Sequence, residues 1–282
     1  MDRCRCLFVS DLHGRVDCYR KLAVVAIDEQ PAVVLVGGDL LPNELRFGGD
    51  FIAEVLRPIF EEIRDRSGGD GVRTLLIPGN DDPGALVEDL LEGEADDLWT
   101  FLHQRIVTIG SYRFAGYGCV PPTPFALKDW ERYDVSRYVD PGCVAPEAGR
   151  RTIPVEVDGT AIRTIEEDLA LLAAGDPLDR TVFLFHSPPY RTVLDRASLD
   201  GVAVDSAPVD VHVGSVAIAS FIEARQPLAT LHGHVHESIR LTGAWHQRLG
   251  RTHLFGAAHD GPELAVVRFD LADLDGARRD LI

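Results

Sequence analysis

Short apolar segments and amphipathic segments alternate through the first quarter of the chain. Apolar runs at 4–10, 32–36 and 72–77 are each bounded by polar or turn-forming residues, a pattern that favours buried strands. Apolar positions at helical spacing separate these runs. Three successive units of this kind predict a parallel sheet that is covered by helices.

The two helices between these strands have recognisable limits. The first covers 19–26, with Asp17 as a possible N-cap and Pro31 as its stop. The second covers 51–63 and contains Pro58, which has no amide hydrogen to donate and should kink the helix. Both helices carry an apolar face, as expected of helices that pack against a sheet.

The rest of the chain supplies further elements around one irregular segment. Residues 121–163 show no clean period and hold Trp130, Tyr133 and Tyr138 among prolines and charges. This excursion is either a partial cap or a structural crossover loop. Strands are predicted within 106–118, at 181–185 and at 228–231, and helices at 165–174, behind the capping box Thr164–Glu167, and at 216–224, behind Ser215. No linker or internal repeat divides the chain, so we expect one domain over 1–282.

Polar side chains that can bind metal ions follow five of the apolar runs. The blocks are Ser10-Asp11-Leu12-His13-Gly14, Gly37-Gly38-Asp39, Gly79-Asn80-Asp81-Asp82, His186 before Ser-Pro-Pro, and Gly233-His234-Val235-His236. Imidazole nitrogens and carboxylate oxygens are usual ligands of borderline divalent metals, and one carboxylate can bridge two ions. In open α/β sheets, ligands bind at the carboxyl ends of the strands. Placement and residue type therefore both predict a dinuclear metal centre.

The blocks differ in how specific they are. Two histidines two residues apart after a buried strand rarely serve packing, so His234 and His236 give the strongest signal. Asp11 with His13 is a weak pattern alone, and Asp39 alone reads equally well as a turn or cap residue. Together and in this order, the five blocks favour a metal site over a set of turn residues.

The chain is strongly acidic, with 45 Asp and Glu against 28 Lys and Arg and a net charge of −17. Such a surface repels nucleic acid polymers and anionic membranes, which are bound mainly through Lys and Arg. No segment approaches the roughly 20 apolar residues of a membrane span. A small phosphorylated substrate is compatible with this charge, because bound divalent ions would invert the sign of the local field.

The cysteines and the first residues indicate the compartment. Cysteines at positions 4, 6, 18, 119 and 143 show no paired spacing, so buried reduced thiols are the better interpretation. The N-terminus lacks the long apolar region and the cleavage site of a signal peptide. We therefore expect a cytoplasmic protein, and the sequence leaves its oligomeric state open.

The five blocks resemble the calcineurin-like metallophosphoesterase superfamily, whose pattern runs Asp-x-His, Gly-Asp, Gly-Asn-His-Asp/Glu, His and Gly-His-x-His. The resemblance spans Asp11 to His236, and four of the five blocks match. It implies a four-layer α/β/β/α sandwich, in which two mixed sheets are flanked by helices and the metal site lies at the carboxyl ends of the strands. It also implies two divalent ions, and Mn, Fe and Zn all suit a mixed set of His and carboxylate ligands.

The resemblance further implies how the donors divide between the ions. There would be a set for one ion (Asp11, His13, His236), a set for the other (Asn80, His186, His234) and a bridging carboxylate (Asp39). A hydroxide shared by two ions about 3.5–4 Å apart would be the nucleophile that attacks phosphorus in line. His234 is in addition a candidate catalytic residue.

The third block departs from the family pattern, because Asp81 stands where the family has a histidine. In the family this histidine acts on the leaving group or stabilises charge, and its partner is the acidic residue that follows, here Asp82. Asp81 could be a protonated acid, if neighbouring carboxylates raise its pKa, or a turn residue without a role. Loss of a proton donor should slow poor leaving groups most, since good ones depart unprotonated.

Other candidate residues lie outside the blocks. Tyr190 and Arg191 follow His186 closely, which makes them candidates for substrate binding. Arg191 could hold a phosphate through two hydrogen bonds, although an ordinary surface arginine fits equally well. His232 is better interpreted as a packing residue than as a further ligand. No recognisable pattern surrounds His103, His212, His246 and His253.

The leading hypothesis is a metal-dependent phosphoric ester hydrolase that cleaves small nucleotide-like or aryl diesters. Diesters carry one charge fewer than monoesters and often have better leaving groups, which suits a site without the usual histidine. A phosphomonoesterase that uses Asp81 or water as the acid is an alternative. A non-catalytic metal-binding scaffold of the same fold is another, although an inactive scaffold is free to lose the ligands that this chain retains.

Overall fold

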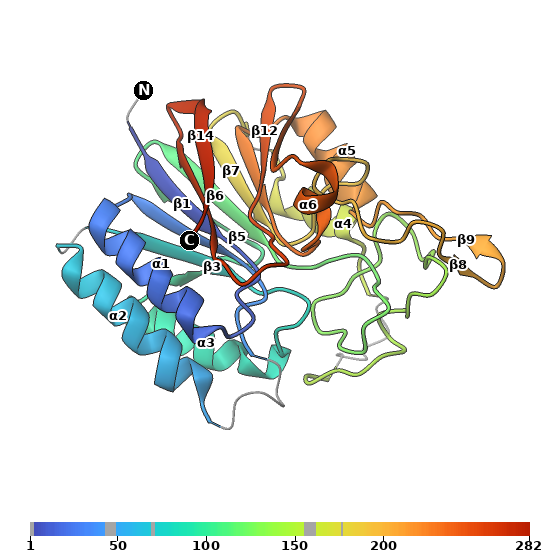
Figure 1. Cartoon of the computed structure of the whole chain (residues 1–282), viewed down its shortest axis with the longest axis horizontal. Coiled ribbons are helices and arrows are strands. Elements are labelled where there is room, and N and C mark those ends of the chain that lie inside the picture. Colours follow the sequence, from blue (N-terminus) through green and yellow to red (C-terminus); the bar gives the residue numbers. More distant parts are fainter. Residues whose placement is uncertain (1–2, 43–48, 69–70, 155–161, 176) are drawn as a thin grey trace.

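The computed structural model describes residues 3–42, 49–68, 71–154, 162–175 and 177–282, and two six-stranded sheets form its centre (Figure 1). The first sheet has the strand order β14-β13-β1-β2-β3-β4, and the second has the order β11-β12-β10-β7-β6-β5. Both sheets are mixed: the first has antiparallel strands at one edge of a parallel set, and the second has them at both edges.

The first sheet contains the three strands that the apolar runs predict. Its members are β1 Arg5–Val9, β2 Val33–Gly37, β3 Arg73–Ile77, β4 Thr100–Phe101, β13 Ala265–Asp270 and β14 Asp273–Leu281. Strands β1 to β4 are parallel, and β13 pairs antiparallel with β1. Val9 is in register with Val36, and Val36 with Leu76, so the residues that follow these strands meet at one edge.

The second sheet is parallel at its centre as well. Its members are β5 Arg105–Ile109, β6 Tyr112–Tyr117, β7 Thr181–Phe185, β10 Ala229–His232, β11 His246–Leu249 and β12 Thr252–Gly256. Strands β6, β7, β10 and β12 run parallel to one another, and β5 and β11 close the two edges as antiparallel strands.

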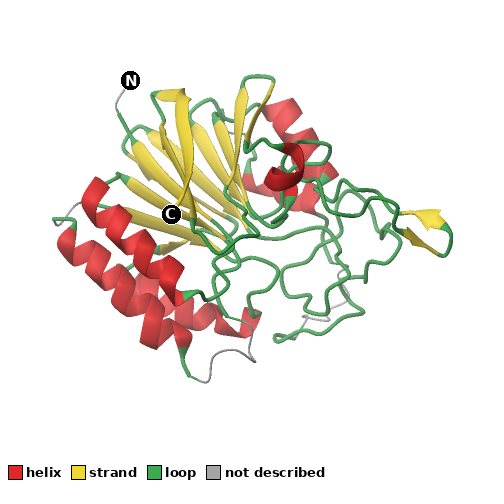
Figure 2. Ribbon diagram, in the orientation of Figure 1, coloured by secondary structure: helices red, strands yellow, loops and turns green. Residues whose placement is uncertain are grey.

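Helices cover the outer face of each sheet. They are α1 Val16–Glu29, a π-helical turn Ile52–Leu56 that continues into α2 Arg57–Arg66, a 3-10 turn Gly84–Leu86 before α3 Val87–Ala95, α4 Ile165–Leu172, α5 Val216–Arg225 and α6 Ser238–Thr242. Figure 2 shows α1 to α3 on one side of the two sheets and the remaining helices on the other. No helix in the described ranges is long and apolar enough to cross a membrane.

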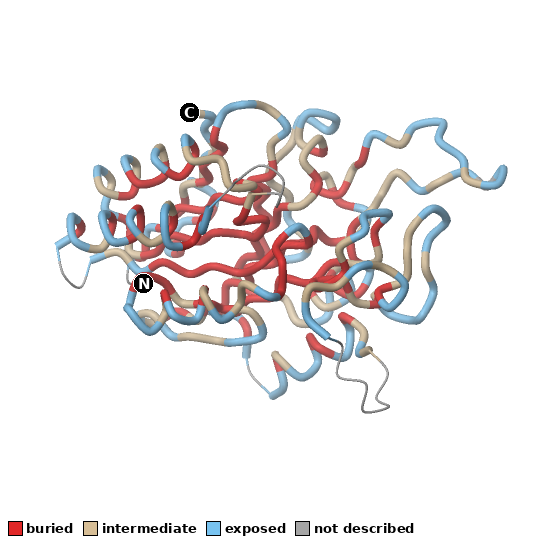
Figure 3. The backbone as a smooth tube through the Cα atoms, turned by 90° about the horizontal axis from the view of Figure 1, so that it is seen from below, coloured by how far each residue is buried: buried red, intermediate tan, exposed pale blue. Residues whose placement is uncertain are grey.

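Alternation along the strands divides the core into layers. In β1, Leu7 and Val9 belong to the apolar cluster that includes the helices, whereas Cys6 and Phe8 belong to the cluster between the two sheets. Successive side chains of a strand point to opposite faces, so both faces of this strand are buried. Buried chain accordingly runs through the middle of the molecule in Figure 3. The predicted four-layer α/β/β/α sandwich is therefore confirmed.

Several local predictions can be compared with the elements. Thr164 and Ser215 cap α4 and α5 as expected, and Thr164 forms a full capping box. The prediction that Asp17 caps the first helix is wrong, because α1 begins at Val16 and Asp17 lies in its first turn. A carboxylate in the first turn still interacts favourably with the helix dipole. Pro58 lies at the start of α2, behind the π-helical turn, where its missing amide hydrogen is tolerated. All five cysteines are free thiols, and four of them are buried.

The excursion is irregular where the structure describes it, and its residues 155–161 lie outside the described part. Isolated bridges join Val120 to Glu131 and Leu127 to Arg150. A fully buried ion pair between Lys128 and Glu131, with nitrogen and oxygen 2.6 Å apart, lies inside it. The short hairpin β8 Ala203–Val204 and β9 Ala207–Pro208 projects from the same side of the molecule in Figure 1.

Candidate metal centre

The seven predicted donors leave the carboxyl ends of five strands that belong to both sheets. Asp11 and His13 follow β1, Asp39 follows β2, Asn80 follows β3, His186 follows β7, and His234 and His236 follow β10. Parallel strands place their carboxyl ends at a common edge, and the two sheets pack face to face. Loops that are far apart in the sequence therefore meet at this edge.

Four donors form one compact cluster. The ligand atoms of Asp11, His13, Asp39 and His236 all lie within 4.8 Å of one another. The Nε2 atoms of His13 and His236 are 3.2 Å apart, and His236 Nε2 is 3.4 Å from Asp11 Oδ1. Asp11 Oδ2 is buried and has no hydrogen-bond partner in the described part of the chain, which is the condition of an oxygen that a cation would satisfy. The residues thus fit a metal ion.

A second group of donors shares Asp39 with the first. His186 Nε2 lies 3.4 Å from Asp39 Oδ2 and 3.1 Å from Asn80 Oδ1. The same Asp39 oxygen lies 3.5 Å from His13 Nε2 in the first cluster. The His234 ring is tilted against the His186 ring at a centroid distance of 5.2 Å. One carboxylate therefore stands between two groups of donors, as a bridging ligand must.

A backbone carbonyl sets the orientation of His186. The carbonyl oxygen of Gly37 can only accept a hydrogen bond, and it lies 2.7 Å from His186 Nδ1. Nδ1 therefore carries the hydrogen, and Nε2 is directed at Asn80 and Asp39. The side chain is fully buried, so this orientation is fixed by packing as well as by the hydrogen bond.

The turns that carry the donors have unusual backbone angles. Asp11, His13, Asp39 and His234 all adopt left-handed φ values, of 58°, 44°, 50° and 72°. Such angles cost side-chain-bearing residues free energy and persist where the surroundings impose them. At Gly79 a Cβ atom would come within 2.2 Å of Asp39 Oδ1, so only glycine lets this chain pass so close to the shared carboxylate.

The cluster attracts positive charge. Burial alone would lower the pKa of His186, but the charge and hydrogen bond of Asp39 raise it to about 10. Asp11 raises the pKa of His236 to about 9 against the same effect of burial. Burial, reinforced by His186, lowers the pKa of His234 to about 3. The two carboxylates thus stabilise two positive charges here, and divalent cations would displace the corresponding protons when they bind.

Asp81 lies at the rim of this cluster with nearly half of its side chain exposed (48%). Its Oδ1 accepts a hydrogen bond from Asn80 Nδ2 at 2.9 Å, which turns the amide oxygen of Asn80 toward His186. Its Oδ2 lies 3.6 Å from His13 Nδ1. Burial and the adjacent Asp39 raise the pKa of Asp81 above its ordinary value. Asp81 therefore contacts the donors, and its bond to Asn80 is a contact that the sequence did not suggest.

Asp82 joins two of the motif loops. Its carboxylate accepts hydrogen bonds from the backbone N–H groups of Leu40, Leu41 and Gly79 at 3.0, 2.8 and 2.8 Å. Leu40 directly follows Asp39, and Gly79 directly precedes Asn80. Burial and the charge of Asp39 raise the pKa of Asp82 to about 7. This side chain thus fixes the loop of the shared carboxylate relative to the loop of Asn80.

The two predicted substrate-binding residues lie on the loop that follows His186. The Tyr190 hydroxyl donates a hydrogen bond to Asp210 at 2.6 Å, and the Arg191 guanidinium covers the Tyr190 ring at 5.2 Å. Within the described ranges no hydrogen bond or ion pair joins either residue to the seven donors. Arg191 is exposed, so it is free to meet a ligand from solvent.

The excursion 121–163 is bonded at two places, one after the third block and one at the start of α5. Asp129 Oδ2 accepts a hydrogen bond from the N–H of Gly84, just beyond the third block. Asp134 accepts hydrogen bonds from Ser215 and Val216 and so caps the start of α5. The partial-cap interpretation of 121–163 is consistent with these two attachments.

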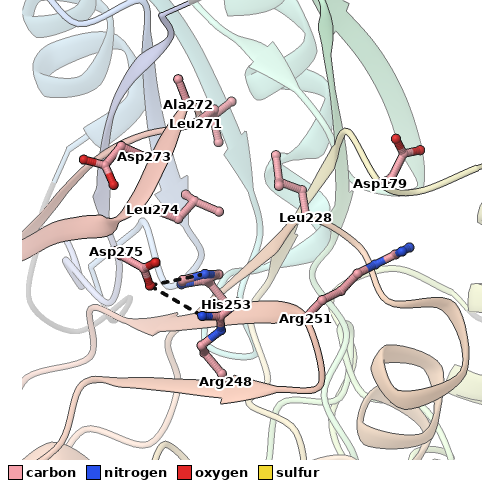
Figure 4. A pocket seen from close by; sticks show the side chains of 10 residues that line it. All are labelled: Asp179, Leu228, Arg248, Arg251, His253, Leu271, Ala272, Asp273, Leu274 and Asp275. Carbon is pink, nitrogen blue, oxygen red and sulfur yellow. Dashed lines mark ion pairs between the residues drawn. The ribbon is translucent and has the colours of Figure 1, made fainter. Parts of the chain in front are cut away.

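A cavity of about 360 Å³ lies at the opposite edge of the sheets and contains none of the motif residues (Figure 4). It is lined by Asp179, Leu228, Arg248, Arg251, His253, Leu271, Ala272, Asp273, Leu274 and Asp275. Arg248 and His253 both face Asp275, at 3.6 and 3.8 Å. The possible metal ligands lie at the carboxyl edge and not in this cavity.

Known proteins share this sequence pattern and this fold. The sequence matches the model of the family described as calcineurin-like phosphoesterase over residues 4–238, whereas no curated protein matches it. A solved chain with 20% identity superposes with a TM-score of 0.65 over 99% of both chains. The structure of TT1561 of Thermus thermophilus has a TM-score of 0.59 and 17% identity over 99% of both chains. A dimetal phosphatase from Danio rerio has a TM-score of 0.54 and 14% identity over 95% of this chain and 96% of that one.

These structural likenesses concern the fold, while the family model also covers the five motif blocks. The match extends from the first strand to the residues beyond His236, which is most of the chain. The chain therefore belongs to the calcineurin-like phosphoesterase family.

Proposed function

We propose that this protein is a metal-dependent phosphodiesterase that hydrolyses small phosphate diesters. The observation that carries the proposal is the convergence of seven donors in two groups that share Asp39. Asp11, His13 and His236 would hold one divalent ion with Asp39, and Asn80, His186 and His234 would hold the other. When bound, two such ions neutralise the non-bridging oxygens of a phosphoryl group and favour deprotonation of the attacking water.

The residues of the chain prepare the site for this chemistry. Gly37 and Asp81 orient His186 and Asn80 through hydrogen bonds, so that both donors point inward. Asp82 holds two of the loops together. Loss of such a supporting contact typically lowers metal affinity or activity 10–100-fold, because the contact fixes the orientation of the ligand.

The preference for diesters rests on the charge at position 81. Asp81 adds a partly exposed carboxylate at the rim, where the family has a histidine. A monoester dianion is repelled more strongly by this carboxylate than a diester monoanion is. The overall charge of −17 acts in the same direction. Asp81, and His234 in addition to its ligand role, are proposed to contact the reacting group.

The test is a kinetic comparison of nitrophenyl monoesters and diesters with protein that has been reconstituted with Mn or Zn. We expect a higher kcat/KM for the diester. Asp39→Ala should abolish activity, and Asp89→Ala, which changes a carboxylate in α3 away from the donors, should leave it unchanged. Equal or better hydrolysis of monoesters would refute the diester preference. Fully metal-loaded protein that hydrolyses neither ester would support the scaffold alternative.

A further inference from the structure

A buried carboxylate and a histidine that the proposed chemistry does not use lie in segments that bond to the loops following His186 and His236. Asp195 is fully buried and accepts hydrogen bonds from the backbone N–H groups of Arg191, Thr192 and Gly214 at 2.8, 2.9 and 3.3 Å. Its Oδ1 also lies 2.8 Å from His212 Nδ1. The carboxylate therefore holds one side of the His212 ring in place.

This contact determines how the imidazole can act. A carboxylate in this bonding position is an acceptor, so Nδ1 of His212 is the donor and Nε2 is left for another partner. The side chain is 30% exposed, and within the described part of the chain Nε2 makes no hydrogen bond. An imidazole that is anchored through Nδ1 and open at Nε2 can transfer a proton to or from a ligand.

Two connections place His212 on the same edge as the metal donors. Ser215 donates its N–H to the Pro188 carbonyl and accepts the N–H of Tyr190, so the segment after His212 pairs with the segment after His186. On the other side, Ser198 donates its N–H to the carboxylate of Glu237 at 3.0 Å.

The short ladder between these connections carries both members of the pair. Val213 donates its N–H to the carbonyl of Asp195, and Ala197 donates to the carbonyl of Val211. Leu194 lies against Gly256 at the carboxyl end of β12, where a Cβ atom would be 2.8 Å from the leucine. The ladder therefore lies across the ends of the strands and is tied to the loops of His186 and His236.

We propose that His212 donates the proton to the leaving group and that Asp195 is the positioning residue of His212. In the family this role belongs to the histidine that Asp81 replaces in this chain. The inference rests on the proposed phosphoesterase function. The imidazolium proton on Nε2 passes to the leaving oxygen as the bond between that oxygen and phosphorus breaks. The electron pair of the broken bond stays on the oxygen, which takes up this proton, while the attacking water gives one proton to solvent and forms the new bond to phosphorus. Neutral His212 then regains its proton from solvent.

Charged groups from several elements surround this ring. Asp195 faces Nδ1, and Asp210 Oδ1 accepts the His212 backbone N–H at 2.9 Å. The Tyr190 ring stands edge-on to the imidazole at a centroid distance of 6.2 Å. Arg196 is the bridge partner of His212 across the ladder.

The experiment measures kcat/KM of the Mn-loaded protein on two diesters that differ only in the leaving group, nitrophenol or an alkyl alcohol. His212→Gln should lower the value for the alkyl ester by about 10²-fold or more and change the nitrophenyl value little, because good leaving groups depart without a proton. His246→Gln is the matched control. This half-buried histidine on β11 bonds to His253, and its loss should leave the ratio of the two substrates unchanged.

Two further variants separate a proton donor from a structural residue. Asp195→Asn should lower the ratio of kcat/KM for the alkyl ester to kcat/KM for the nitrophenyl ester by about 10–100-fold. The reason is that the amide no longer favours the required tautomer of His212. Thermal unfolding of each variant reports whether the loop remains folded. Asp81→His should restore alkyl hydrolysis in the His212→Gln background, because it returns a histidine to the family position.

The outcomes distinguish this inference from the proposed function. Absence of nitrophenyl diester hydrolysis in the metal-loaded wild type contradicts the proposed function itself. Hydrolysis of both diesters with a ratio that His212→Gln does not change overturns the role of His212 alone. An increase of about 10²–10⁴-fold on the alkyl ester from Asp81→His in otherwise unchanged protein also overturns it, because the proton donor would then be missing from the wild type.

Discussion

Replacement of Asp82 by alanine tests whether this one buried side chain holds the metal-binding loops together. The carboxylate is 1% exposed and accepts three backbone N–H groups, from Leu40, Leu41 and Gly79. A buried donor left without a partner costs about 1–3 kcal/mol, so three of them cost about 3–9 kcal/mol. Alanine would also remove these links between the loops of Asp39 and Asn80, which would then keep the bond from the Asp81 N–H to Asp39 Oδ1 at 2.9 Å.

A second effect reduces this cost. The pKa of Asp82 is raised to about 7, mainly by burial and next by Asp39, so its ionised form is disfavoured in the folded protein. At about 1.36 kcal/mol per pKa unit, removal of the carboxylate at pH 7 relieves up to about 4 kcal/mol. Because all three donors are buried, we take the middle and upper part of their range, about 6–9 kcal/mol, and subtract about 4 kcal/mol. Asp82→Ala should then lower the free energy of unfolding by about 2–5 kcal/mol. Asp82→Asn keeps one acceptor oxygen without the charge and should lower it less.

The measurement is urea unfolding of metal-free protein at pH 7, followed by far-ultraviolet circular dichroism. Competition with a chromogenic chelator then gives the metal affinity, which we expect to fall about 10–100-fold. Glu88→Ala in α3 changes an exposed carboxylate and should stay within about 0.5 kcal/mol of the wild type. A loss below about 1 kcal/mol together with unchanged metal affinity for Asp82→Ala would refute the reasoning.

Three other predictions concern separate parts of the molecule. Metal analysis after reconstitution should find two ions per chain, near none in Asp39→Ala, and about one in His13→Ala; fewer than one ion in the wild type contradicts the two-ion site. Lys128→Met should lower the free energy of unfolding in urea by about 3–5 kcal/mol, because it leaves the Glu131 charge unpaired in the interior. The double variant Lys128→Met/Glu131→Leu should recover most of this loss. Equal losses in the single and the double variant would show that the unpaired charge is not the cause. Burial lowers the pKa of His103 to about 3, so the unfolded chain binds its proton first. This residue should therefore contribute a loss of stability of about 1.5 kcal/mol between pH 6.5 and 5, and His103→Phe should reduce the measured loss by that amount.

The sequence predicted the elements whose signals are local. Strands β1, β2 and β3 are continuous apolar runs that end in glycine or polar residues, and the capping box of Thr164 lies within four residues. The donors could be found for the same reason, because each follows its strand directly. Their division between two groups followed from the family resemblance and not from spacing.

Elements that depend on distant contacts were not predicted. Strand β14 reads Asp-Leu-Asp-Gly-Ala-Arg-Arg-Asp-Leu and has no apolar period, because it is an exposed edge strand held by its pairing with β13. The excursion is fixed by Asp129 and Asp134, which bond to N–H groups 45 and 82 residues away. Asp195 and His212 are 17 residues apart and form no motif, so only the folded chain brings them together.

The left-handed turns at Asp11, His13, Asp39 and His234 have a consequence for metal exchange. These turns belong to the main-chain fold, so the fold itself sets where the four donors lie. Binding then requires little ordering of the polypeptide, and the relative affinities of different ions depend mainly on their own coordination preferences. Where several divalent ions compete, occupancy should therefore follow the intrinsic order of ligand affinity and the supply of each ion, and the same apoprotein should accept one metal in place of another without refolding.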